Sequence, residues 1–259
     1  MLPFLLDQPT HLVNWASPLN QGLVSWWLAM SGRMGGGTWF DLCGLRPSPV
    51  DLSLGYWGGS SRPGGNAILR TGTGLGTQTV SGNVSLNMAT NEFTVGSWIY
   101  MSKVISGGSV TVNFAFRWSL SVSDTAITFN SSVGKAKLTT AIADGWYHVV
   151  GVLDASNAIL YVNGLPVATT ARTGSYSQSV QDLSWRVQNY SAGWDDTRIH
   201  FRPFSAGQVA ELYRDSYQGN PRTINRYRRP LVFDTGGGGG GGGLSIPIAL
   251  YHYQHHFAA

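Results

Sequence analysis

The stretch GWYHVVGVLDASNAILYVNGLPVAT, residues 145–169, predicts two antiparallel strands joined by a short turn. An apolar run rich in β-branched residues ends at Asp154, and the turn sequence Ala-Ser-Asn follows it. A second apolar run leads to Asn163-Gly164, a dipeptide typical of two-residue turns because both positions tolerate positive φ. We therefore expect a β-hairpin here, with a tight turn at its far end.

Segments on both sides of this hairpin have the pattern of further strands. Alternating or apolar runs bounded by turn residues lie at 22–30, 37–44, 91–102, 109–132, 184–190 and 194–204. Residues 55–76 are interrupted by glycine, proline and serine, which favours a loop or weakly ordered edge strands. The side chains expected on the inner faces of the sheets are Trp98, Trp146, Val149, Val152, Leu160 and Val162.

One helix is predicted after the last strand. Ser205 and Gln208 have the spacing of a capping box, and an apolar stripe follows at Val209, Leu212 and Tyr213. The sequence Gly-Asn-Pro at 219–221 ends the helix. The expected fold class is all-β: a two-sheet antiparallel sandwich over residues 21–219 with one short C-terminal helix and extended terminal arms.

Composition limits the class of protein. Charged residues make up 12% of the 259 positions and the net charge is +4, with no broad basic stripe of the kind that binds nucleic acid. Cys43 is the single cysteine, so no disulfide can form within the chain. No apolar run approaches the length of a membrane span, and the first residues lack the basic start of a secretion signal.

Four segments together resemble a known family. They are GLVSWWLAM with FDLCG, EFTVGSWIY, WYHVVGVLDASNAILYVNGLPV and WDDTRIHFRPFSAGQVAELY, and they resemble the corresponding strands of laminin-G-like, concanavalin A-like jelly-roll domains over roughly residues 20–218. The flanks NWASPLNQGLVSWWL and LYRDSYQGNPRTINRYRR resemble laminin-G-type structural proteins of tailed phages. The resemblance implies a jelly-roll sandwich, and a place in a virion assembled in the host cytoplasm.

Catalysis is not expected. Glycoside hydrolases of this superfamily use two nearby carboxylates, but the chain has only two glutamates, Glu92 before a strand and Glu211 on the predicted helix. The adjacent pair Asp195-Asp196 would point to opposite faces of a regular strand. No nucleophile motif surrounds a serine, and Cys43 has the sequence context of a small buried residue. We expect no catalytic residues.

The resemblance also implies ligand binding, because laminin-G-like domains bind calcium or sugars through loop carboxylates and amides. The stretch 68–80, where the family often carries acids, has none here. The expected ligand-binding residues are therefore Asp195, Asp196, Asn163 and Trp194, with Asp154 as a helper. The alternative is structural: one aspartate ties a turn and the other is solvated or pairs with Arg198. Of the tryptophans that could stack on a sugar (Trp26, Trp27, Trp57, Trp118, Trp185 and Trp194), we expect one or two at most to be exposed.

The C-terminal segment is predicted to attach the protein to a partner. After an N-terminal arm (1–20) and the sandwich (21–219) come a basic connector (220–235), a polyglycine spacer (236–243) and an apolar, histidine-rich anchor (244–259). The anchor would add a strand to another virion subunit or to a copy of this chain. Its expected partner-binding residues are Leu244, Ile246, Ile248, Leu250, Tyr251, Tyr253, Phe257, His252, His255 and His256. The histidines are interpreted as interface hydrogen-bonding groups, the alternative being a metal shared between chains.

These observations predict a non-enzymatic virion structural protein that displays a lectin-like sandwich. The alternative is a glycan-binding lectin or adhesin module, in one version dependent on calcium. No resident cofactor or metal is expected otherwise, and no nucleic-acid partner.

Overall fold

The computed structural model describes residues 13–27, 38–43, 47–49, 56–59, 66–70, 75–80, 91–103, 108–114, 117–174, 183–188 and 190–217. The chain divides into two units, residues 1–226 and 227–259, and every described residue lies in the first. The C-terminal anchor and the polyglycine spacer lie outside the described residues.

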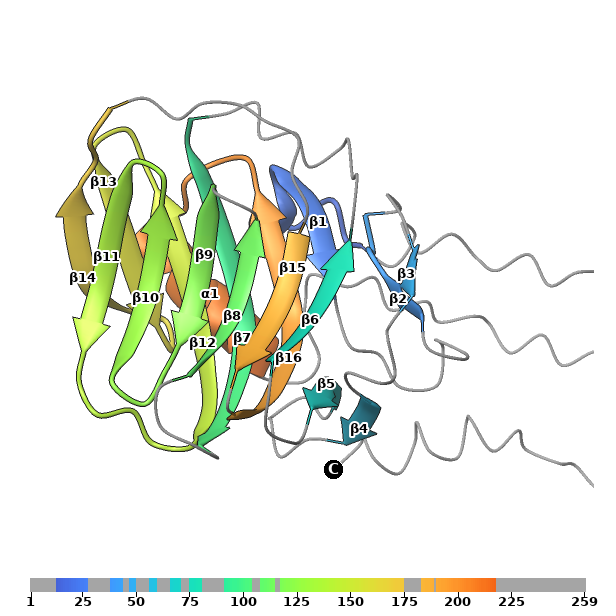
Figure 1. The fold of residues 1–259 in the computed structure, drawn as a ribbon. Coiled ribbons are helices and arrows are strands. Elements are labelled where there is room, and N and C mark those ends of the chain that lie inside the picture. The colour runs from blue at the N-terminus through green and yellow to red at the C-terminus, as the bar shows by residue number, and fades with distance from the viewer. Residues whose placement is uncertain are drawn as a thin grey trace, which may run out of the picture. The chain divides into compact units, whose positions relative to one another are not determined.

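Two antiparallel sheets pack face to face (Figure 1). Among the described residues, the larger sheet has eight strands and the smaller has six. In spatial order the eight-stranded sheet consists of β14 (Leu165–Ala171), β13 (Asn157–Val162), β12 (Gly145–Leu153), β7 (Phe93–Lys103), β16 (Tyr190–His200), β5 (Asn66–Arg70) and β4 (Tyr56–Gly59), with β1 (Leu23–Trp27) paired to β16. The six-stranded sheet consists of β11 (Gly134–Thr139), β10 (Ala126–Ser131), β9 (Trp118–Val122), β8 (Ser109–Phe114), β15 (Leu183–Gln188) and β6 (Leu75–Val80). A separate pair joins β2 (Thr38–Phe40) to β3 (Pro47–Pro49).

The predicted hairpin is confirmed. β12 pairs with β13 in the register Val149 to Val162, and β13 continues into β14 through the turn at Asn163 and Gly164. Both turn residues have positive φ, 51° and 81°, as the Asn-Gly sequence predicts. The two-sheet antiparallel sandwich predicted from the sequence is therefore the observed fold.

The core between the sheets follows the period-2 pattern of the strands. In β8, β9 and β15 every second side chain is buried, and Phe93, Ile99 and Leu160 meet them from the eight-stranded sheet. Gly151 lies where the sheets approach closely: a Cβ at this position would come within 2.3 Å of the Phe129 ring. The aromatic ring of one sheet thus packs directly on the backbone of the other.

The prediction of inner-face residues is wrong for three of its six positions. Val149, Leu160 and Val162 belong to the core between the sheets. Val152 instead packs on the opposite face with the helix, and the Trp98 ring lies 5.7 Å from the ring of the helical residue Tyr213. Trp146 lies an even number of residues from Val152 on β12, so it shares that outer face. The eight-stranded sheet has buried apolar side chains on both faces, because the helix covers part of the outer one.

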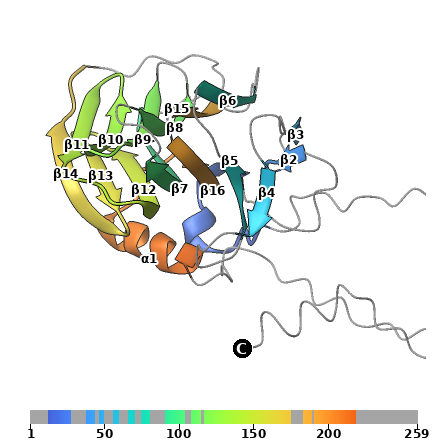
Figure 2. The same ribbon diagram turned by 60° about the horizontal axis from the view of Figure 1, so that its bottom comes forward.

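The helix α1 (Ala206–Tyr217) lies across the outer face of the eight-stranded sheet (Figure 2). Its predicted capping box is formed: the Ser205 amide donates to Gln208 Oε1 at 3.0 Å, and the Gln208 amide donates to Ser205 Oγ at 3.3 Å. Val209 and Leu212 are buried against Val150 of β12. Within the described residues, no helix is long and apolar enough to cross a membrane.

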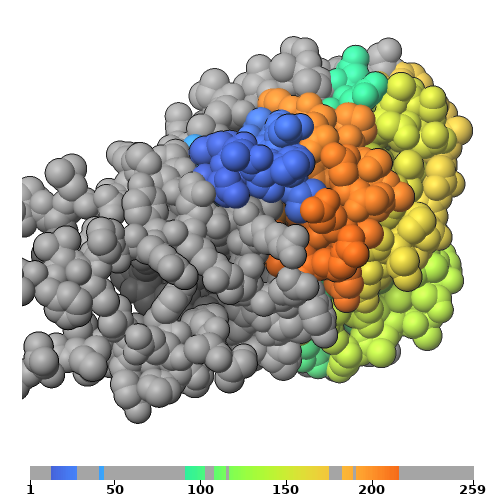
Figure 3. Space-filling model, turned by 180° about the vertical axis from the view of Figure 1, so that it is seen from behind, coloured from blue at the N-terminus to red at the C-terminus, as the bar shows by residue number. Residues whose placement is uncertain are grey.

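Residues 13–20 do not form an arm. Val13 and Leu19 are buried, and residues 18–20 form a 3-10 turn (Pro18–Asn20). Figure 3 shows this N-terminal segment lying against β16 and α1 on the rear of the molecule. The sequence predicted an arm over residues 1–20 because Pro3, Pro9 and Pro18 interrupt that stretch. In the structure Leu19 packs in one cluster with Val150 and Phe204, and Val13 packs in another with Leu23 and Trp26.

Candidate functional site

A β-bulge in β16 determines where the predicted Asp195-Asp196 pair points. Asp195 faces Trp98 of β7, but the next paired residue, Arg198, faces Gly96, so β16 carries one extra residue. Asp196 occupies the bulge with a φ of 51°. The bulge breaks the regular alternation on which the sequence argument depended, and it directs Asp196 toward Arg198.

Asp196 is the centre of a buried polar cluster on the outer face of the sheet. Its Oδ1 accepts hydrogen bonds from Trp26 Nε1 at 2.6 Å and from Arg198 Nε at 2.7 Å, and its Oδ2 accepts from an Arg198 terminal nitrogen at 3.1 Å. The guanidinium carbon lies 3.9 Å from the centroid of the Trp26 ring, and Oδ2 of Asp215 on α1 lies 3.7 Å from a terminal nitrogen of Arg198. Asp195 accepts the Asp196 amide hydrogen at 2.6 Å. Both aspartates are 2% exposed, so their carboxylates face the protein rather than solvent.

A second buried cluster accounts for the sequence around Cys43. Asp41 accepts the amide hydrogens of Trp26 and Cys43, at 2.8 and 3.0 Å, and the hydroxyl hydrogen of Ser25 at 2.9 Å. The Trp27 indole donates to the same Ser25 hydroxyl at 2.8 Å. Burial raises the pKa of Asp41 to about 6 and also raises the pKa of the Cys43 thiol. These residues join β1 to the segment after β2, and the thiol stays protonated.

The other predicted ligand residues are engaged elsewhere in the fold. Trp194 is packed in the core between the sheets, and Asn163 Oδ1 accepts the His148 amide hydrogen at 2.9 Å. Asp154 Oδ1 accepts two amide hydrogens in the turn after β12. No hydrogen bond or ion pair brings these side chains to the aspartates of β16 in the described part of the chain. Nor do the described residues contain a group of three or more His, Cys, Asp or Glu side chains placed to hold a metal.

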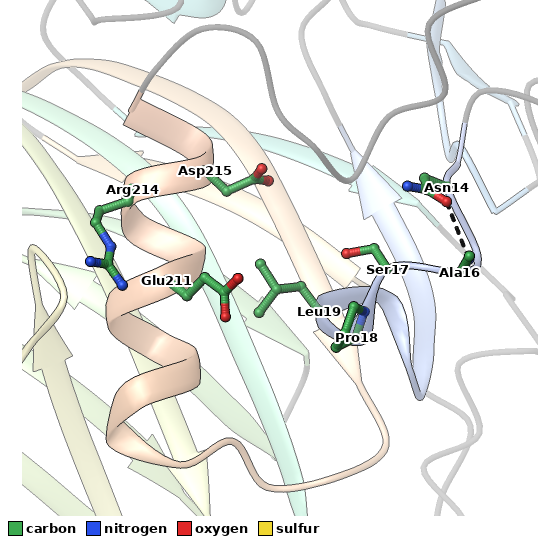
Figure 4. Close-up of a pocket in the computed structure, with 8 residues that line it drawn as sticks. All are labelled: Asn14, Ala16, Ser17, Pro18, Leu19, Glu211, Arg214 and Asp215. Carbon is green, nitrogen blue, oxygen red and sulfur yellow. Dashed lines mark hydrogen bonds between the residues drawn. The ribbon is translucent and has the colours of Figure 1, made fainter.

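A groove lies between the N-terminal segment and α1 (Figure 4). It has a volume of about 650 Å³ and is lined by Asn14, Ala16, Ser17, Pro18, Leu19, Glu211, Arg214 and Asp215. In the close-up, the carboxylates of Glu211 and Asp215 extend from the helix toward the segment that carries Ser17 and Asn14. Glu211, Arg214 and Asp215 of α1 form one wall, and amide, hydroxyl and apolar groups of residues 14–19 form the other.

Trp15 stands in the sequence between two lining residues of this groove, Asn14 and Ala16, and the sequence analysis did not single it out. The residue is 49% exposed. By contrast, Trp26, Trp27, Trp118, Trp185 and Trp194 are all buried. The signal in the sequence was its position in Asn-Trp-Ala-Ser-Pro, a turn-forming stretch without the period-2 pattern that buries an aromatic ring.

The fold and these sites define a lectin-like jelly-roll sandwich. The chain belongs to the concanavalin A-like lectin/glucanases superfamily, whose family model matches residues 72–210. A comparison with curated protein sequences gives no match.

Solved structures with the same fold are distant in sequence. The binding domain of Paraclostridial Mosquitocidal Protein 1 is 14% identical with a TM-score of 0.58, over 75% of this chain and 52% of that chain. Botulinum neurotoxin type C, whose cell entry depends on interaction with two ganglioside molecules, is 13% identical with a TM-score of 0.52, over 76% and 52%. Trypanosoma rangeli sialidase in complex with sialic acid is 14% identical with a TM-score of 0.54, over 77% and 34%. The chain thus spans about half the length of the toxin chains, and the likeness concerns the fold.

Proposed function

We propose that the protein is a non-catalytic carbohydrate-binding module and that the groove between residues 14–19 and α1 holds the sugar. The observation that carries this proposal is the groove together with the exposure of Trp15, the residue between the lining residues Asn14 and Ala16. Carboxylates such as Glu211 accept hydrogen bonds from sugar hydroxyls, and apolar side chains such as Leu19 pack on the C–H faces. A half-exposed indole such as that of Trp15 offers a flat surface for a pyranose ring. The ganglioside and sialic acid named for two of the structural neighbours favour a glycan as the ligand class.

Glu211 and Arg214 are the two exposed charged residues of the groove, and the Glu211 carboxylate extends toward residues 14–19 in Figure 4. The Glu211 side chain forms no hydrogen bond or ion pair with the described residues. Asp215, in contrast, is 6% exposed and lies 3.7 Å from Arg198. We therefore assign sugar contacts first to Glu211 and Trp15.

The test is a glycan-array screen of the full chain, followed by calorimetry on the glycans that bind. Trp15→Ala and Glu211→Gln should each weaken binding about tenfold, with unchanged thermal denaturation, because one removes stacking area and the other a charged acceptor. Leu165→Ala and Glu92→Gln make the same kinds of change away from the groove, at the other exposed large apolar side chain of the described residues and at the other glutamate. The proposal would be overturned if no glycan on the array bound the protein, or if Leu165→Ala and Glu92→Gln weakened glycan binding as much as the groove variants do.

Absence of catalysis is part of the same proposal. The chain has only two glutamates, Glu92 before β7 and Glu211 on α1, so no single strand carries the two carboxylates that glycoside hydrolases of this superfamily use, which supports this part of the proposal. Incubation with a panel of β-glucans and agar should release no reducing ends. Release that disappears in Glu92→Gln or Glu211→Gln would contradict it.

We further propose that the module is displayed on a phage-like particle and attached through residues 244–259. The sequence favours this role: sixteen apolar, aromatic and histidine-rich residues follow eight glycines. An apolar peptide of this kind is stable in water when it is covered by a partner chain. Mass photometry of the full chain should reveal oligomers, or assembly onto purified particles. A monomer that binds no particle at micromolar concentration would argue against this role.

A further inference from the structure

The outer face of the six-stranded sheet carries two continuous rows of polar side chains. This is the face toward the viewer in Figure 1, opposite to the side on which α1 lies. Residues directly opposite one another on neighbouring strands share a face, so the strand registers define each row. The first row crosses β11, β10, β9, β8 and β15 at Lys137, Thr128, Ser121, Thr111 and Arg186. The second row crosses the same strands at Lys135, Asn130, Ser119, Asn113 and Ser184.

The side chains of the two rows form almost no hydrogen bonds with the rest of the described residues. The exception is Thr111, whose Oγ1 lies 3.4 Å from Ser109 Oγ. The buried hydroxyls of the other sheet differ: Thr197 accepts from the Trp185 indole and bonds with Ser97. Apart from Ser184, which is 7% exposed, the row residues are exposed or half-buried. The hydroxyl and amide groups of the row residues other than Ser184 are therefore open to a ligand.

The charges on this face have one sign. On its described strands, Lys135 and Lys137 of β11 and Arg186 of β15 are the outward charged side chains, and all three are exposed. β11 and β15 are four strand spacings apart, which is roughly 19 Å. Positively charged side chains thus lie at the two ends of this polar surface, with neutral hydroxyl and amide groups between them.

The residue types on this face favour an acidic polysaccharide over a nucleic acid as the anionic polymer that binds there. Proteins that bind single-stranded nucleic acid combine a basic groove with aromatic stacking platforms. The outward positions of β8–β11 and β15 hold no aromatic residue. An acidic polysaccharide instead presents carboxylates or sulfates at intervals, with hydroxyls between them. Arginine and lysine pair with the acidic groups, and serine, threonine and asparagine exchange hydrogen bonds with the hydroxyls.

We propose that this face binds an extended acidic polysaccharide that lies across the strands, with its acidic groups paired to Lys135 and Lys137 at one end and to Arg186 at the other. This surface is separate from the groove beside α1, so either site can fail without the other. Binding depends on exposed charges, and it therefore weakens as salt is added.

The experiment uses the full chain and biolayer interferometry on immobilised polygalacturonate, dextran sulfate, neutral dextran and a thymidine oligonucleotide. We expect binding to one or both acidic polysaccharides and none to dextran, with affinity falling between about 50 mM and about 300 mM sodium chloride. The triple change Lys135→Gln, Lys137→Gln and Arg186→Gln should reduce affinity about tenfold, because three exposed ion pairs are lost. Thr128→Val, which replaces a hydroxyl by a methyl at nearly constant volume, should give a smaller loss.

Two controls separate this site from general charge attraction and from the groove. Arg226→Gln, Arg228→Gln and Arg229→Gln together remove the same net charge from the basic connector and should leave polysaccharide affinity unchanged. Glu211→Gln should likewise leave it unchanged, and the sheet triple variant should leave groove binding unchanged. The proposal is overturned by equal loss in the connector variant, by tighter binding of the oligonucleotide, by dextran binding as tight as that of the acidic polymers, or by no binding of either acidic polymer. Circular dichroism and thermal denaturation verify that each variant is folded.

Discussion

Arg198 shows at the scale of one residue how this fold holds a buried charge. Its guanidinium is 1% exposed, and Asp196 pairs with it at 2.7 Å while the Trp26 ring covers it. Asp196→Ala would remove the close partner and leave Asp215 at 3.7 Å. Breaking a buried pair in this way costs about 3–5 kcal/mol, because one charge is left uncompensated. Urea denaturation should give this loss, against a smaller loss of about 1 kcal/mol for the same change at exposed Asp144, whose carboxylate accepts a hydrogen bond from Ser102 Oγ at 2.8 Å. Equal effects at the two positions would contradict the structural role of the cluster.

His200 gives the folded state a dependence on pH. It is fully buried, and its Nε2 lies 3.0 Å from the Leu19 carbonyl oxygen, to which the neutral ring donates a hydrogen. Burial, and then the charges of Arg198 and Arg202, lower the pKa of His200 from 6.5 to about 3. The unfolded chain therefore takes up a proton as the pH falls below its ordinary value, and the folded chain does not until about pH 3. The stability linked to neutral His200 is present above pH 6.5 and is lost as the pH falls toward 3.

Asp41 changes the stability of the fold in the opposite direction, because burial raises its pKa from 3.8 to about 6. Its contribution to the free energy of unfolding increases as the pH falls between these two values, so a substitution at His200 is needed to isolate the contribution of the histidine. His200→Gln keeps a side-chain donor for Leu19 but does not titrate. The difference in unfolding free energy between wild type and variant should shrink between about pH 7.5 and about pH 4.5, as measured in urea. A constant difference would show that His200 does not titrate on unfolding.

At the scale of the element, α1 is stabilised at its first turn by the reciprocal bonds between Ser205 and Gln208. Ser205→Ala removes the cap and should cost about 1 kcal/mol. Gly207→Ala should have the opposite sign and gain up to about 1 kcal/mol, because alanine favours the helix. A Cβ there would meet only Ser205 Oγ, at 3.9 Å. Chemical denaturation of the two single variants checks both signs, and a loss of stability in Gly207→Ala would contradict the open surroundings of this position.

The two sheets approach each other closely at Gly151 of β12, where the Phe129 ring of β10 packs against the backbone. An added methyl would lie 2.3 to 2.6 Å from atoms of the Phe129 ring on β10, so Gly151→Ala forces the sheets apart or rotates the ring. Overpacking of this kind costs about 1–3 kcal/mol. Phe129→Leu should reduce the cost of Gly151→Ala, since the smaller side chain leaves room for the methyl. Additive losses in this double-mutant cycle would show that the ring is not what excludes a side chain at Gly151.

For the whole molecule, the sequence predicted the features that depend on neighbouring residues. The Asn163-Gly164 turn, the capping box at Ser205 and the strand patterns are local, and the structure confirms them. Features set by distant contacts were not predictable in the same way. The face on which Trp98 lies depends on α1 covering the sheet, and the direction of Asp196 depends on a bulge relative to β7. The exposure of Trp15 depends on how residues 13–20 fold back onto the sandwich.

The polar rows of the six-stranded sheet were present in the sequence as an alternation, but the alternation alone could not identify them. Strands such as TVNF and SLSV alternate polar and apolar residues in any half-buried sheet. The registers align Lys137 with Arg186 across three intervening strands, and that alignment is a property of the assembled sheet. A candidate binding surface of this kind emerges only when all the strands are paired.

The last prediction concerns the division of the chain into a folded module and an attachment segment. Burying an aliphatic or aromatic side chain gains about 1.5–3 kcal/mol, so five or six residues of the anchor would gain on the order of 10 kcal/mol. Ordering sixteen residues at about 1–2 kcal/mol each opposes this gain, which makes a single anchor marginal on its own. Strand addition to the partner, and several copies acting together, would supply the difference.

Deletion of residues 236–259 should therefore leave the melting temperature of the sandwich unchanged and abolish assembly, as read by calorimetry and mass photometry. A matched variant that keeps the full length but replaces Ile246, Ile248 and Leu250 with serine should show the same loss of assembly, because the apolar side chains supply the gain. If the truncated chain joins its particle or oligomer as well as the full chain does, attachment lies in the sandwich itself.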